Sequence, residues 1–138
     1  MSGVLNNDAA DALGALVHGI ELVRDSAAAG VDLAPSMASL ALAGARSATL
    51  VAAPSDARAS YDPGLWLDVV ALNGLSRQLL AEFQSHGAEG IARIIDGQSS
   101  DLRSAEHRLG TFRNAQRRIA QMFESLPAGS ERSRDLAK

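Results

Sequence analysis

Histidine and glutamate side chains occur at helical spacing in two places, and they are the residues of this chain best suited to metal chemistry. His18 and Glu21 are three residues apart, and Glu82 and His86 are four apart, so each pair would share one helix face. A dinuclear centre in a helical bundle uses two Glu-x-x-His motifs and two further glutamates. Here the first pair has the reverse order and the second has a different spacing. We therefore expect no metal site, and solvated or locally hydrogen-bonded side chains instead.

The sequence contains no pattern for an activated nucleophile or a phosphate-binding loop. Gly-x-Ser-x-Gly, Walker and dinucleotide-binding glycine patterns do not occur. The chain has no cysteine, which excludes disulfides and thiolate metal sites. These observations predict a protein that is not an enzyme, has no catalytic residues and needs no cofactor.

The last third of the chain carries the clearest pattern. Apolar residues recur there at steps of three and four, and Gln116 occupies one position of the same seam. This spacing predicts an amphipathic helix that must lie against another surface. The seam consists of Leu102, Ala105, Leu109, Phe112, Ile119, Phe123 and Leu126.

Five arginines accompany the seam, at positions 103, 108, 113, 117 and 118. With Leu102 at heptad position a, Arg108 and Arg113 flank the seam, so a parallel homodimer would oppose like charges. This favours antiparallel packing, either on the first helix of the same chain, near Glu21 and Asp25, or on an acidic partner. Gln116 would then help to fix the register. We expect a partner surface made of Leu109, Phe112, Ile119 and Phe123 with Arg108, Arg113, Arg117 and Arg118, although the arginines as a merely solvated face are the alternative.

The charge is unevenly distributed along the sequence. Residues 1–98 contain eleven acidic residues and five arginines, a net charge of −6, whereas residues 99–138 contain five acidic and eight basic residues, a net charge of +3. An acidic body with a basic last segment indicates internal neutralisation first and an acidic partner second.

The composition favours helices throughout, because alanine is abundant and β-branched runs are rare. The expected helices begin at Asn7 or Asp8 and end at Gly30, extend from Pro35 to Pro54, start at Asp62-Pro63, and start at Ser99 or Ser100. The predicted fold is an all-α bundle of four or five helices, with a long C-terminal helical hairpin formed by residues 63–96 and 99–125. Residues 1–126 would form one domain, and 127–138 a disordered tail. Neither a signal peptide nor a transmembrane segment is apparent, which predicts a cytoplasmic protein.

These features predict a non-catalytic helical interaction module, such as an adaptor, a regulator or an assembly subunit, that binds a protein partner or a second copy of itself.

Two resemblances to known families give alternative functions. Three segments resemble the helix-turn-helix of phage-repressor-type DNA-binding domains: Gly74-Leu75-Ser76, Leu80-Ala81-Glu82 and Ile91-Ala92-Arg93-Ile94. That resemblance implies a DNA-binding regulator using residues 64–97, with one helix ending at Gly74 and the recognition helix ending at Gly97. Residues 69–126 resemble in composition the phasins that coat storage granules of polyester-storing bacteria, which implies a surface-coating role.

Overall fold

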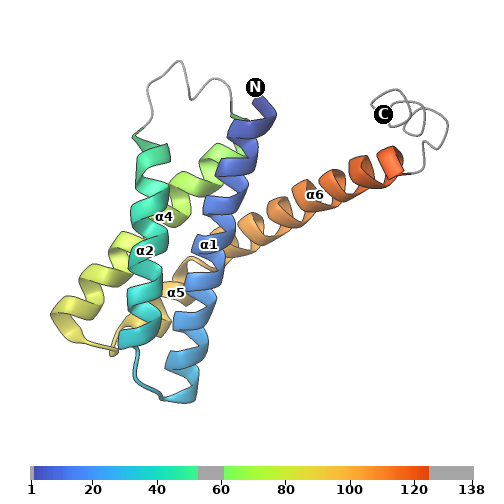
Figure 1. Ribbon diagram of the computed structural model, residues 1–138. Coiled ribbons are helices and arrows are strands. Elements are labelled where there is room, and N and C mark those ends of the chain that lie inside the picture. The colour runs from blue at the N-terminus through green and yellow to red at the C-terminus, as the bar shows by residue number, and fades with distance from the viewer. Residues whose placement is uncertain (1, 53–60, 125–138) are drawn as a thin grey trace, which may run out of the picture.

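The computed structural model describes residues 2–52 and 61–124, without the side chains of residues 2–6. Within these ranges the chain forms five helices and no strand (Figure 1), which confirms the predicted all-α fold. The helices are α1 (Ser2–Ala29), α2 (Ala34–Val51), α4 (Pro63–His86), α5 (Ile91–Gly97) and α6 (Ser99–Glu124). The predicted end of the seam at Leu126, the predicted tail 127–138 and most of the connector between α2 and α4 lie outside the described residues.

Local sequence signals set several helix ends. The carboxylate of Asp62 accepts a hydrogen bond from the Leu65 amide at 2.9 Å, and Pro63 follows in the first turn, as the sequence predicts. Gly30 has a φ of +71° directly after α1, a conformation that glycine adopts without steric cost. The predicted start of α1 was wrong, because the helix already begins at Ser2. Asparagine costs a helix interior less than about 0.7 kcal/mol, so Asn7 is tolerated inside the first turns.

The predicted long helix over residues 63–96 is divided into two helices. α4 ends at His86, and Gly87 turns the chain with a φ of +65°. A side chain at Gly90 would contact the Glu82 carboxylate, because a Cβ built there lies 2.6 Å from Oε2. Gly74, by contrast, lies in the interior of α4, so the expectation that one helix ends there was wrong. The continuous apolar face of α4 outweighs the cost of one interior glycine, which is about 1 kcal/mol.

One apolar core joins all five described helices. The periodicity of the first helix predicts one apolar face, and this face is buried in full: Ala9, Leu13, Leu16, Ile20 and Val23 are all 0% exposed. α5 contributes two buried isoleucines although it has only seven residues. Each helix therefore contributes one stripe, as expected for a bundle. The largest fully buried side chains are those of Leu13, Leu16, Ile20, Leu40, Leu65, Leu72, Leu79, Ile91 and Ile95.

A buried polar contact holds α2 against α4. The Asn73 amide nitrogen donates to the Gly44 carbonyl at 3.1 Å and to the Ser47 hydroxyl at 2.7 Å. Gly44 also lies against Ser76, whose Oγ would be 3.0 Å from a Cβ at that position. The small residues Gly44 and Ser47 therefore allow a close contact between α2 and α4.

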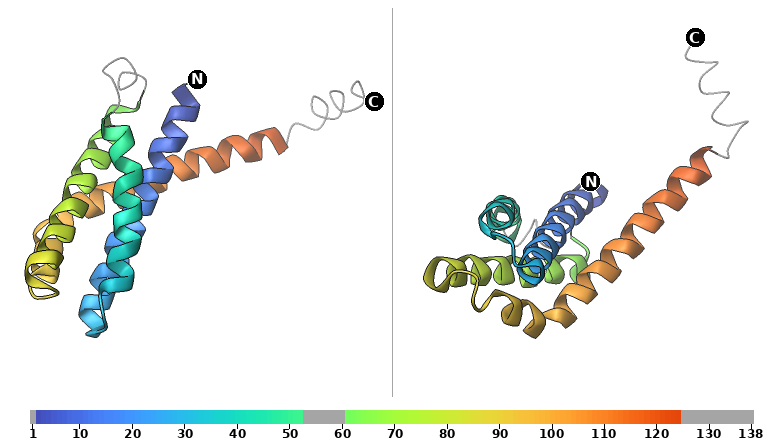
Figure 2. Two further views of the ribbon diagram at one scale, coloured as in Figure 1. Left: turned by 60° about the vertical axis from the view of Figure 1, so that its left-hand side comes forward. Right: turned by 90° about the horizontal axis from the view of Figure 1, so that it is seen from below.

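α6 crosses the bundle and then leaves it. In all the views its C-terminal end lies well away from α1, α2 and α4 (Figures 1 and 2). From Gly110 onward every side chain of α6 is exposed except that of Phe112, which is half-buried. We call residues 111–124 the projecting half of α6.

Candidate protein-interaction surface on α6

The first half of α6 is anchored in the core. Leu102, Ala105 and Leu109 are at most 7% exposed, and this part of the helix packs on α1, α4 and α5. Leu109, predicted to contact a partner, therefore lies inside the bundle. Its role in this structure is to hold the root of the projecting half in place.

Arg108 also makes an internal contact. Its Nε donates to Asp68 Oδ2 at 2.6 Å, and the Asp68 carboxylate also lies 3.4 Å from the Ser104 hydroxyl. The guanidinium lies directly over Gly64, where any side chain would collide with it. Arg108 thus neutralises a carboxylate that is 9% exposed and ties α6 to the first turns of α4. We leave it out of the candidate surface for this reason.

Contacts between α1 and α6 follow an antiparallel order, as the seam predicts. Glu21 meets Glu106, Gly14 lies beneath the Arg113 guanidinium, and the Gln116 amide donates to Asn7 Oδ1. Because residue numbers fall along α1 as they rise along α6, the two helices run in opposite directions. Gln116 takes part in this register, but through an exposed contact rather than a buried one.

The projecting half of α6 continues the core-facing stripe beyond the bundle. Ile119 is 55% exposed and Phe123 is 67% exposed, although both share the helix face of Leu109 at heptad spacing. Phe112 is half-buried where the stripe leaves the core. Large apolar side chains that lie together on one exposed face are typical of an interaction surface, which makes this stripe the candidate site.

The arginines of this half lie outside the apolar stripe. Arg117 Nη2 donates to Asn114 Oδ1 at 3.1 Å, and Arg118 is exposed. In the part of the chain that the structure describes, no carboxylate lies within 4.0 Å of the guanidinium groups of Arg113, Arg117 and Arg118. Their positive charges are therefore not neutralised by the described residues.

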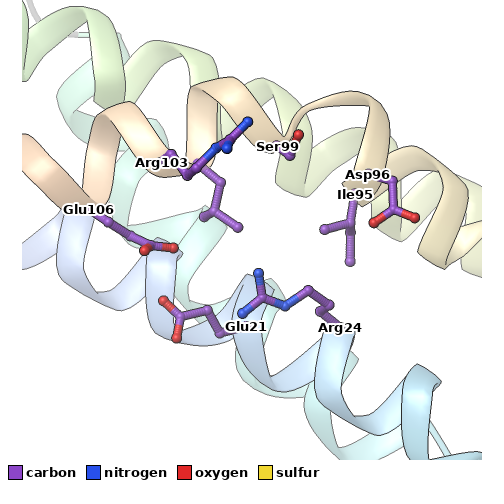
Figure 3. A pocket seen from close by; sticks show the side chains of 8 residues that line it. Glu21, Arg24, Ile95, Asp96, Ser99, Arg103 and Glu106 are labelled. Carbon is purple, nitrogen blue, oxygen red and sulfur yellow. The ribbon is translucent and has the colours of Figure 1, made fainter.

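A groove of about 360 Å³ between α1, α5 and α6 collects charged side chains. Figure 3 shows the Glu21 and Glu106 carboxylates pointing toward each other, with Arg24 beside them. Burial raises the pKa of Glu21 above its ordinary value, and the negative charge of Glu106 raises it further. The groove is also lined by the buried side chains of Ile95 and Leu102.

One of the two histidine–glutamate pairs makes the local contact that its helical spacing predicts. His86 Nδ1 lies 3.1 Å from Glu82 Oε2, and the His86 side chain is 62% exposed. Over the described ranges, no group of three or more histidine, aspartate or glutamate side chains is arranged to hold a metal ion. The structure therefore offers no donor set of the kind that a metal centre requires.

Sequence reasoning missed the partner of Arg108, although a signal was present. Asp68 lies between Leu65 and Leu72 on the buried face of its helix, and a carboxylate in such a place needs a cation or several donors. The signal does not identify the cation, because Arg108 is forty residues away in the sequence. The path of α6 across the bundle determines which of its arginines lies beside Asp68.

Comparisons with known protein families, curated proteins and solved structures found no match to this chain. Among the described helices, none has both the length and the apolar character needed to cross a membrane. The fold and the surface define a helical bundle with one projecting helix, and the function must be argued from that surface.

Proposed function

We propose that the protein is a non-catalytic helical interaction module that binds a protein partner through the projecting half of α6. The observation that supports this proposal is the exposure of Ile119 and Phe123 on a helix whose other half is fixed in the core. The partner would complete a helix face that α1 and α4 cover only as far as Phe112.

The energetics favour a partner contact of this kind. Burying a large apolar side chain contributes about 1.5–3 kcal/mol relative to leaving it in water, and aromatic residues commonly dominate the affinity of an interface. Phe123 and Ile119 are therefore the expected anchors, with Phe112 at the inner edge. The arginines around them would contribute more to the association rate and the salt dependence than to affinity.

The anchored half of α6 makes the projecting half suitable for presentation to a partner. Arg108 fixes the helix to α4, and Arg113 and Gln116 fix it to α1. A surface on a rigid element loses less conformational entropy on binding than one on a loop. This arrangement suits an adaptor or assembly subunit, in which a body holds one binding helix.

Site-specific photo-cross-linking in the source cells tests this proposal. A photoreactive residue is placed at position 123, and the matched control carries it at Gln121, which lies on nearly the opposite side of the same turn. The expected result is a discrete protein adduct at position 123 that is weak or missing at position 121.

Three results would contradict the proposal. Cross-links to nucleic acid at position 123 would favour the DNA-binding alternative, and cross-links to lipid would favour the surface-coating alternative. Equal labelling at positions 121 and 123 would mean that the apolar stripe selects no partner at all.

A further inference from the structure

We infer that the occupant of the projecting half of α6 is an acidic amphipathic helix, about four turns long, that belongs to a different protein. This inference rests on the proposed function and specifies its partner. It depends on the shape of the surface, on its continuity with the core, and on its charge.

The shape of the surface fits a helix. The exposed stripe lies on one straight helix rather than in a groove, and Phe112, Ile119 and Phe123 follow one another at steps of seven and four. Such spacing matches the knobs-into-holes packing of two helices. The fourteen residues from 111 to 124 span about 21 Å at 1.5 Å per residue, so a helix of about four turns would cover the described part of the stripe.

The same helix face already packs against helices where it enters the bundle. Leu102, Ala105 and Leu109 contact α1 and α4 through this face, and Ile119 and Phe123 continue it outward without a change of side. A partner helix would therefore extend an existing helix–helix interface from the point where α1 and α4 no longer cover it.

The charge around the stripe selects against a second copy of this chain. The projecting half contains Arg113, Arg117 and Arg118 but only one acidic residue, Glu124. Pairing two such helices would bring six arginines together with two glutamates, whereas an acidic helix would neutralise charges that no described carboxylate meets.

The three arginines lie on the two flanks of the stripe rather than opposite it. Successive residues of a helix rotate by about 100°, which places Arg113, Arg118 and Arg117 about 100°, 120° and 140° from the middle of the stripe. Gln121 lies directly opposite the stripe, at about 180°. An acidic helix on the stripe would therefore approach the flanking arginines but not Gln121, which provides a control position.

The test uses the full chain and two synthetic peptides of 21 residues. Both peptides have leucine at heptad positions a and d; one has glutamate at the flanking positions and the other has lysine. Binding is measured by fluorescence anisotropy at 50 and 500 mM NaCl. We expect the glutamate peptide to bind at least about tenfold more tightly at low salt, and to lose most of that preference at high salt, where charges are screened beyond about 4–5 Å.

Single-charge changes then test the geometry. Arg118→Gln should weaken the glutamate peptide and strengthen the lysine peptide, each several-fold. Gln121→Glu changes the net charge by the same amount on the far side of the helix and should shift both much less. Equal effects of the two substitutions, equal affinity for the two peptides, or no binding of either would overturn the inference. Circular dichroism confirms that both variants fold.

Sedimentation equilibrium separates this inference from the proposed function. A monomer across salt concentrations supports a partner from a different protein. A dimer that Phe123→Ala dissociates would overturn the inference and make the second copy the occupant, while the proposed function would stand. Failure of the proposed function itself would appear in the cross-linking experiment, as lipid, nucleic acid or unselective adducts at position 123.

Discussion

Truncating one apolar residue in each half of α6 should lower the free energy of unfolding by very different amounts. Leu109→Ala removes a side chain that is only 7% exposed, and substitutions of this kind cost about 2–5 kcal/mol, depending on how far the cavity collapses. Phe123 is 67% exposed, so about a third of the roughly 3 kcal/mol available from full burial is at risk, or about 1 kcal/mol. Alanine also forms helix better than phenylalanine by about half a kcal/mol. The net cost of Phe123→Ala should therefore be below about 1 kcal/mol.

Urea unfolding followed by circular dichroism measures both free energies, and an unchanged m-value shows that the two-state comparison is valid. Phe112→Ala provides an intermediate case, because its side chain is half-buried. A loss of about 2 kcal/mol or more for Phe123→Ala would refute the reasoning, since it would mean that the projecting half packs on the body in solution. A loss for Leu109→Ala that is no larger than that for Phe123→Ala would refute the placement of the core boundary.

Three further predictions concern the internal contacts. Arg108→Ala should lower the free energy of unfolding by about 1–3 kcal/mol, because it leaves the Asp68 carboxylate without its cation; Asp68→Asn in the same chain should recover part of the loss in urea unfolding. Asn73→Ala should cost about 1–3 kcal/mol, since the Gly44 carbonyl and the Ser47 hydroxyl lose a buried donor, and thermal unfolding measures the loss. Glu21→Gln should stabilise the protein at neutral pH by less than about 1 kcal/mol. The raised pKa of Glu21 means that the native state resists ionisation of this carboxyl. The gain in stability should therefore fade as the pH drops through that pKa and vanish below 4.5, where the carboxyl is neutral in both the folded and the unfolded state. Urea unfolding over a pH series measures this dependence, and a gain in stability that grows on acidification would contradict it.

Several helix ends could be predicted from local signals in the sequence, although the capping signal at Asn7 and Asp8 did not mark the start of α1. Asp62 and Pro63 mark a start, Gly30 marks an end, and the buried face of α1 follows from periodicity alone. The break between α4 and α5 could not be located, because three glycines compete and only the packing of Ile91 and Ile95 decides which one turns the chain. Local propensities differ by about 1 kcal/mol, and tertiary contacts outweigh them.

The candidate surface on α6 could be predicted only in part for a related reason. Periodicity identifies one apolar face along the whole of α6, but the boundary between core and surface depends on where α1 and α4 end beside it. The sequence therefore groups Leu109 with Phe123, although one is buried and the other is exposed. It also groups Arg108 with Arg118, although only the first meets a carboxylate in the described residues.

Two arginines of α6 reach the body at glycines, and this decides how firmly the projecting half is held. Arg108 lies over Gly64 on α4, and Arg113 lies over Gly14 on α1; a Cβ at Gly14 would lie 2.7 Å from the Arg113 guanidinium. Each glycine leaves room for a long cationic side chain on a neighbouring helix, so α6 is held from two sides around the start of the projecting half. The apolar surface beyond them can therefore stay exposed without drawing α6 back onto the bundle, because the arginines and Leu109 hold the helix in a direction that carries Ile119 and Phe123 away from the core.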